Sequence, residues 1–242
     1  LAVAPTEIES VKPSASGTLL ELLKYPRATA LVILIWLGIS TANYGIYLWG
    51  PTILAMQLHV TAGEAAGYFF YVALAGLAGK FLFSFLPHRF GRVPTGIFGG
   101  YMLAVILGAI AFWHDGLIFG LPVFLVLLIV GALFFDGIFA NQSPYSAEVF
   151  PVQLSARGVG IGQAANGIGK ILGPLSLAFL AGADNLVKPE ATAEAMKPGF
   201  LFLAGMGLVI GLAFTFLGIE THGRPLAIGD SDQGGSEGDK AL

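Results

Sequence analysis

Long uninterrupted apolar stretches dominate the chain. Six of them reach the length of about 20 residues that a helix needs to cross a bilayer. They cover residues 28–56, 62–85, 94–113, 117–140, 159–181 and 200–219. These stretches are apolar on every face and lack the ten-residue alternation typical of membrane β-barrels. The pattern predicts an all-α membrane protein in which residues 28–219 form a bundle of six transmembrane helices.

The composition excludes an ordinary soluble domain. Hydrophobic residues make up 55% of the chain, charged residues only 11%, and the mean hydropathy is +0.79, whereas a soluble domain carries about 25% charged residues. The 34 glycines suit membrane helices, because small residues let two backbones approach closely. There is no cysteine, and a net charge of −3 without a long basic block gives no reason to expect nucleic acid as a partner.

Two polar segments flank the predicted bundle. We expect residues 1–27 to form a cytoplasmic linker with a short surface helix at 19–25, and residues 220–242 to form a largely disordered cytoplasmic tail. Basic residues near the span ends gather on one side, at Lys24, Arg27, Arg89, Arg92, Arg157 and Arg224, while the other side holds Lys188 and Lys197. The positive-inside rule then predicts that both termini are cytoplasmic, and that residues 182–199 form the longest outer loop of a protein in the inner or plasma membrane.

Three motifs occur in order at the basic ends of the spans. The first is Leu-Pro-His-Arg-Phe-Gly-Arg-Val at residues 86–93. The second is Glu-Val-Phe-Pro at 148–151 followed by Arg-Gly at 157–158, and the third is Glu-Thr-His-Gly-Arg-Pro-Leu at 220–226. In this order and at these junctions they resemble the C-terminal half of a major facilitator superfamily transporter, of the branch that includes sugar porters and proton symporters of organic acids. His88 stands where the family's first motif has Asp.

The resemblance implies a fold and a gate. The family fold has twelve helices in two halves, each with a 3+3 inverted repeat, so it implies a missing N-terminal six-helix half; the start at Leu1 instead of Met likewise suggests a processed chain or a fragment. It also implies a cytoplasmic gate whose ion pairs form in one transport state and break in the other. The motif residues assigned to this gate are Arg89, Gly91, Arg92, Glu148, Arg157, Glu220 and Arg224. The alternative is that these arginines only anchor the helix ends at the membrane surface.

Charges within the spans are the strongest candidates for a binding site. Asp136 and Lys170 lie about 18 Å and 20 Å along their helices from Glu148 and Arg157, at a rise of 1.5 Å per residue, and so fall near the bilayer midplane. Exposing a charge to lipid at this depth costs at least about 2.5 kcal/mol, so both side chains must face protein or a water-filled cavity. We expect Lys170 to bind an anionic substrate group and Asp136 to carry a proton, with a changing distance between the two altering proton affinity. A structural ion pair is the alternative, and Lys80, nearer the cytoplasm, is equally compatible with snorkelling.

Uncharged polar side chains lie close to these charges in the sequence. The candidates for substrate or proton binding are Asn43, Tyr44, Tyr47, Asn141, Gln142, Gln163 and Asn166. Gln163, Asn166 and Lys170 follow one another at helical spacing, which predicts a single stripe. Hydrogen bonding between helices is the alternative interpretation of these amides.

The sequence as a whole predicts a secondary active transporter rather than an enzyme. No metal-ligand cluster or nucleophile motif is recognisable in it, and we expect no cofactor, with the proton as coupling ion. A small-molecule substrate, the lipid bilayer and the missing half are the expected partners. The positive charge of Lys170 within the membrane favours an organic acid as the substrate. We therefore expect proton-coupled symport of a small organic acid by alternating access. The alternatives are a sugar or polyol porter, or a six-span membrane protein that does not transport.

Overall fold

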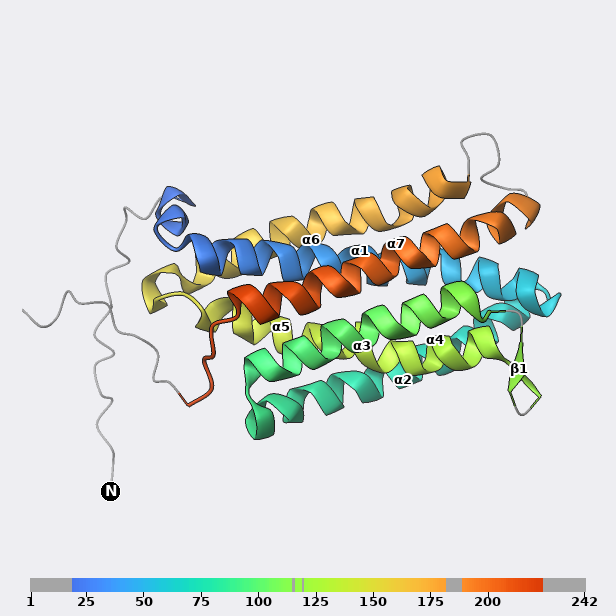
Figure 1. Ribbon diagram of the computed structural model, residues 1–242, viewed down its shortest axis with the longest axis horizontal. Coiled ribbons are helices and arrows are strands. Elements are labelled where there is room, and N and C mark those ends of the chain that lie inside the picture. Colours follow the sequence, from blue (N-terminus) through green and yellow to red (C-terminus); the bar gives the residue numbers. More distant parts are fainter. Residues whose placement is uncertain (1–18, 115, 119, 182–188, 224–242) are drawn as a thin grey trace, which may run out of the picture.

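The computed structural model describes residues 19–114, 116–118, 120–181 and 189–223 of the 242-residue chain. The described elements are η1 (Leu19–Lys24), α1 (Pro26–Leu58), α2 (Ala62–Phe90), α3 (Arg92–Phe112), β1 (Leu117–Ile118), β2 (Leu121–Pro122), α4 (Val123–Phe135), α5 (Gly137–Glu148), α6 (Val152–Ala181) and α7 (Pro189–Leu217). The long helices run side by side as one elongated bundle (Figure 1). Because α4 and α5 continue one another, these elements form six spans, as the apolar pattern predicted.

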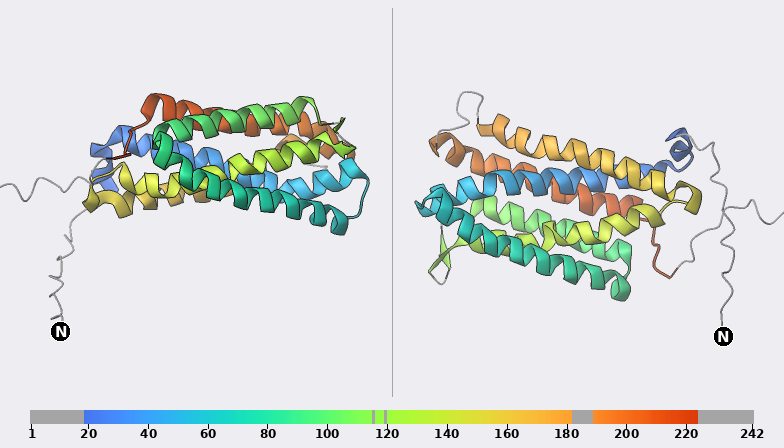
Figure 2. Two further views of the ribbon diagram at one scale, coloured as in Figure 1. Left: turned by 90° about the horizontal axis from the view of Figure 1, so that it is seen from below. Right: turned by 180° about the vertical axis from the view of Figure 1, so that it is seen from behind.

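Five of the described spans are long and apolar enough to cross a membrane: α1, α2, α3, the combined Val123–Glu148 segment, and α7 from Met196. The helix α6 also has the length, at 30 residues, but it carries Gln163, Asn166 and Lys170 and is therefore more polar. It lies along α1 over much of the bundle (Figures 1 and 2). The protein is thus an all-α, multi-pass membrane protein.

Helix pairing follows a two-fold scheme. The first span packs extensively on α6, the second on α4 and α5, and α3 on α7. Exchanging the first three spans with the last three leaves these pairings unchanged, as expected for a 3+3 repeat. Glycines permit the closest pairings: a Cβ at Gly100 would collide with the backbone of Gly211 on α7, and a Cβ at Gly173 with the backbone of α1. Such contacts bring backbones together where packing and hydrogen bonds, more than the hydrophobic effect, hold membrane helices to one another.

One end of the bundle carries the basic motifs, and we call it the basic end. There η1, the α2–α3 turn, the α5–α6 turn and the end of α7 come together (Figure 2). The α1–α2 turn and the β1–β2 hairpin lie at the opposite end. At that opposite end Thr61 caps α2 through a reciprocal capping box with Glu64, which explains this acid at the start of a span.

Several span boundaries differ from those predicted. The fourth span begins at Val123 rather than Leu117, because Leu117–Ile118 and Leu121–Pro122 form a short antiparallel hairpin. Gly120, with φ of 79°, permits the hairpin turn, and Pro122 precedes the helix. The second span continues through Pro87 to Phe90, so most of the expected loop 86–93 is helical. The helix α7 begins at Pro189, within the expected outer loop 182–199, whose first seven residues lie outside the described part of the chain.

Candidate functional site: a polar belt at mid-depth and an ion-pair network at the basic end

Asp136 lies at the junction of α4 and α5, about halfway along the fourth span, and is only 5% exposed. The Tyr47 hydroxyl donates a hydrogen bond to Asp136 Oδ2 at 2.5 Å, and Asn43 Nδ2 donates a long one to Oδ1 at 3.5 Å. Lys80 Nζ lies 3.3 Å from Oδ1. The carboxylate is therefore held by two polar side chains of α1 and one cation of α2.

Glycines on α2 make room for this carboxylate. A Cβ at Gly76 would overlap the carboxylate of Asp136, and a Cβ at Gly79 would overlap the backbone of Leu133. The spacing Gly76-x-x-Gly79-Lys80 thus serves two purposes: the glycines bring α2 against the fourth span, and the next residue supplies the cation. Sequence reasoning left Lys80 between snorkelling and function, and the glycines directly before it were the signal that it faces another helix.

Lys170, on α6, contacts a different residue of α1. Its Nζ sits over the ring of Tyr44, 4.9 Å from the centroid, in a cation–π contact. In this structure Lys80, and not Lys170, is the cation that contacts Asp136. Because Tyr44 follows Asn43 on α1, both lysines nevertheless belong to one set of side chains, which we call the polar belt: Lys80, Asp136, Asn43, Tyr47, Tyr44 and Lys170.

The predicted stripe on α6 divides between two environments. Gln163 and Lys170 are exposed, whereas Asn166 is buried and accepts a hydrogen bond from Ser40 Oγ at 2.6 Å. Asn166 Nδ2 also donates to Gln163 Oε1 at 2.8 Å. Asn166 therefore joins α6 to α1, which is the alternative that the sequence left open for it.

Asn141 and Gln142 are turned away from Asp136. Asn141 accepts from Arg92 Nη1 at 3.4 Å and donates to Arg92 O at 3.2 Å, so it belongs to the basic end. Gln142 is fully buried and donates to Ile35 O at 3.1 Å on α1. In the structure, both candidates thus join helices through these hydrogen bonds.

At the basic end Arg92 and Glu148 form a two-point ion pair. Arg92 Nη2 lies 2.6 Å from Glu148 Oε1, and Nε lies 3.0 Å from Oε2. Thr221 Oγ1 donates to the same Oε2 at 2.6 Å. Paired donors of this kind fix orientation as well as charge, so α3, α5 and the segment after α7 are fastened together.

Glu220 caps the start of α3 from a distant part of the chain. Its carboxylate accepts four backbone N–H groups at 2.9 to 3.1 Å, those of Arg92, Val93, Thr221 and His222. Gly91, with φ of 95°, lets the chain turn here, and a Cβ on it would meet this carboxylate. Burial alone would raise the pKa of Glu220, but the four hydrogen bonds hold it below its ordinary value. An acid at a helix N-terminus is favoured by the helix dipole as well.

Other predicted gate residues have different partners. Arg157 pairs with Glu21 of η1 at 3.2 Å and not with Glu148, and Arg89 is exposed. Arg224 lies outside the described residues. Sequence reasoning also missed Tyr145, whose hydroxyl both donates to Ile219 O and accepts from Ile219 N at 2.9 Å.

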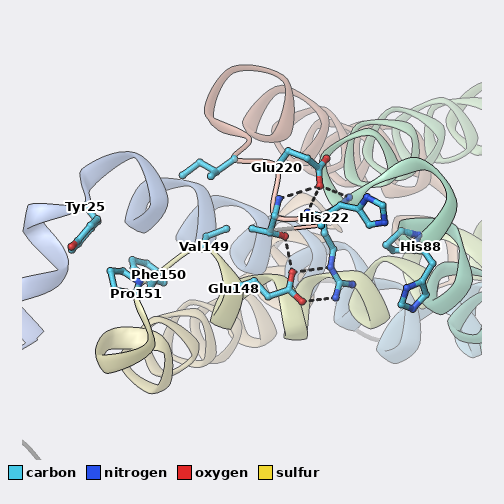
Figure 3. A pocket seen from close by; sticks show the side chains of 13 residues that line it. Tyr25, His88, Glu148, Val149, Phe150, Pro151, Glu220 and His222 are labelled. Carbon is cyan, nitrogen blue, oxygen red and sulfur yellow. Dashed lines mark hydrogen bonds and ion pairs between the residues drawn. The ribbon is translucent and has the colours of Figure 1, made fainter. Parts of the chain in front are cut away.

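A cavity of about 520 Å³ opens at the basic end. Its apolar side is formed by Tyr25, Phe150 and Pro151, and its polar side by Glu148, Glu220 and His222, with His88 beyond (Figure 3). The cavity borders the Arg92–Glu148 ion pair.

No protein-family model matches the sequence. Among curated proteins, the chain is 25% identical over 203 residues to the niacin transporter NiaP of Acinetobacter baylyi, covering 84% of this chain and 43% of the transporter. It is 30% identical over 184 residues to inorganic phosphate transporter 1-6 of Oryza sativa, covering 71% and 31%. It is 27% identical over 223 residues to human solute carrier family 22 member 13, covering 89% and 35%.

The chain spans less than half the length of each of these relatives. All three matches cover most of this chain, so it is the relatives that extend beyond the matched region. They are transporters and not enzymes, in agreement with the function class that the sequence predicted. The six-span bundle, the motifs joined at its basic end and these similarities agree with one six-helix half of a major facilitator superfamily transporter.

Proposed function

We propose that the chain forms the C-terminal half of a secondary active transporter that carries a small organic anion together with a proton. The observation that carries this proposal is the charge balance of the polar belt. Two lysines and a single carboxylate lie there, and within the described residues Lys170 contacts an aromatic ring but forms no ion pair with a carboxylate. An unneutralised cation at this depth is unfavourable against lipid, so a bound anion is its natural counterpart.

The names of the relatives support an anionic substrate. They include niacin, inorganic phosphate and, for a protein of Acinetobacter baylyi 30% identical over 148 residues, cis,cis-muconate. All three compounds are anions at neutral pH. A neutral sugar or polyol would leave the charge of Lys170 uncompensated.

The polar belt is not enclosed by this chain alone. The side chain of Lys80 is 51% exposed and Tyr44 is 36% exposed, so the belt opens on the surface of the bundle. We infer that an N-terminal six-helix half covers this surface and that the substrate binds between the halves, near the membrane midplane. Asn43, Tyr47 and Gln163 would then line the site with Lys170, and Asp136 would carry the proton.

The basic end serves as the gate in this proposal. Its carboxylates each bind groups from different elements, so rocking of the bundle has to break several bonds together. We place this end on the cytoplasmic side of a plasma or inner membrane, because most of the Lys and Arg residues near the span ends lie there. Reaction of a membrane-impermeant label with a Cys introduced at Lys197 only from the cytoplasmic side would overturn that orientation.

Reconstitution of the full transporter that contains this chain tests the function. Proteoliposomes should accumulate a labelled carboxylate against its gradient when the side of entry is acidic, and an uncoupler should abolish the accumulation. A neutral sugar of similar size is the control. Equal uptake of the sugar, or carboxylate accumulation that ignores the pH gradient, would contradict the proposal.

A further inference from the structure

Lys80 stands between the buried acid and the open surface of the belt. Asp136 is 5% exposed, whereas the side chain of Lys80 is 51% exposed although its Nζ lies 3.3 Å from Asp136 Oδ1. A ligand that enters from the surface of the bundle can therefore reach the side chain of Lys80. It cannot reach the carboxylate behind that side chain.

The surroundings of Asp136 leave its charge dependent on this one lysine. From α1 it faces the neutral side chains Asn43 and Tyr47, and from α2 it faces Lys80 and the bare backbone at Gly76. Lys170, on α6, lies over Tyr44. Within the described part of the chain, Lys80 is thus the charged group that contacts Asp136.

We propose that Lys80 couples anion binding to proton uptake by changing its partner. This inference rests on the proposed function and deepens it. An anionic group of the substrate binds Lys80 Nζ and draws it away from Asp136. The carboxylate then keeps only the hydrogen bonds from Tyr47 and Asn43, and a buried carboxylate without a counter-ion favours its neutral form. Asp136 takes a proton from water at Oδ1, the oxygen that Lys80 has left.

The charges balance in both states. Before binding, Lys80 and Asp136 sum to zero. After binding, the cation of Lys80 is matched by the substrate anion, and protonated Asp136 is neutral. One proton enters with each anionic group that engages Lys80, and no other bond forms or breaks. The Lys80–Asp136 pair with its ligands therefore keeps the same net charge in both states, and the charge of Lys170 does not change. Binding either the anion or the proton alone would change that net charge by one.

The proposal separates the two lysines by function. Lys80 couples anion and proton, whereas Lys170 contributes attraction for the anion without contacting Asp136. The test measures anion affinity and proton uptake on binding, from pH 5 to 8, in the full transporter. In the wild-type protein a fall in pH should tighten anion binding by up to tenfold per pH unit, with about one proton taken up per anion.

Four variants decide the outcome. Lys80→Met and the double variant Lys80→Met/Asp136→Asn should bind the anion at least tenfold more weakly, without pH dependence and without proton uptake. Lys80→Arg keeps the cation and should keep the coupling. Lys170→Met, the matched control, should weaken binding while the remaining binding still takes up a proton. Because the double variant removes both charges, it remains informative if Lys80→Met alone fails to fold.

The overturning results are distinct from failure of the proposed function. Suppose that Lys80→Met, or the double variant, still binds the anion in a pH-dependent way and takes up a proton. Lys80 and Asp136 would then form only a structural pair. A wild-type transporter that binds anions without taking up protons would contradict proton-coupled symport itself.

Discussion

The polar belt and the ion-pair network differ in how completely their charges are satisfied. At the basic end, both oxygens of Glu148 and of Glu220 accept hydrogen bonds from Arg92 or its neighbours. The belt holds two lysines but only one carboxylate: Lys80 pairs with Asp136, whereas Lys170 lies over the ring of Tyr44. A closed set of partners favours one arrangement of the helices, whereas an open set has an affinity left for a ligand. The same residue types therefore join helices in one region and, in the proposed function, bind the substrate in the other.

Removing the acid of the belt should have the largest effect. Asp136→Asn retains the size of the side chain and one acceptor oxygen but removes its titration. We expect uphill, pH-driven uptake to fall to background while exchange of substrate across the membrane continues. Measuring both in the same proteoliposomes checks this expectation. Accumulation that persists in Asp136→Asn would place the coupled proton in another part of the transporter, such as the N-terminal half.

The packing that admits Asp136 should be almost as sensitive. A methyl group at Gly76 overlaps the carboxylate, and overpacking of this kind costs about 1–3 kcal/mol. We expect Gly76→Ala to lower the yield of folded protein and its thermal unfolding midpoint. Gly67→Ala, on the same helix with no atom near the added Cβ, is the matched control and should behave as wild type. Equal behaviour of the two variants would mean that α2 does not approach the fourth span as described.

The sequence was sufficient for the spans but not for the rotation of each helix. Depth depends on residue spacing alone, and Asp136 indeed lies halfway along its span. Facing depends on the angle around the helix axis. Asn141 is five residues after Asp136, which turns it about 140° around the helix, towards Arg92. Asn43 and Tyr47, one turn apart on α1, share a face, and both contact Asp136.

Partners across the bundle were also beyond sequence reasoning. Lys80, and not Lys170, reaches Asp136 because glycines let α2 come close, a tertiary fact that spacing within one helix cannot supply. Glu220 was recognised by its motif, but its contact with the first turn of α3 joins residues 128 positions apart. The hairpin before α4 was hidden for a different reason: residues 117–122 are apolar enough to extend a span, and only Gly120 and Pro122 signal a turn.

Lys170 allows a direct comparison between two lysines with the same aromatic contact. Lys170 lies over Tyr44 in the belt, and Lys197 lies over Phe112, each 4.9 Å from the ring centroid. We expect Lys170→Ala to weaken substrate binding about tenfold, or about 1.4 kcal/mol, with expression unchanged. Lys197→Ala removes an equivalent cation–π contact outside the belt and should leave affinity unchanged. Equal affinities for the two variants, measured by titration of the purified transporter, would remove Lys170 from the site.

The smallest effect is expected at Glu220, because several other hydrogen bonds and ion pairs also hold the basic end together. Glu220→Gln retains an acceptor but loses the charge at the start of α3, a change worth about 1 kcal/mol or less. The pKa of Glu220 is lowered in the folded protein, so its charge stabilises the fold above the unfolded pKa of about 4.3, and this contribution disappears as pH falls through the lower folded value. Between about pH 5 and 3 the unfolding midpoint should therefore fall less steeply in Glu220→Gln than in wild type. Glu21→Gln, which breaks only the surface pair with Arg157, is the control at the same end. Parallel pH profiles for wild type and Glu220→Gln would show that the four hydrogen bonds do not depend on the charge, and the contrast between a closed network and an open belt would lose its electrostatic basis.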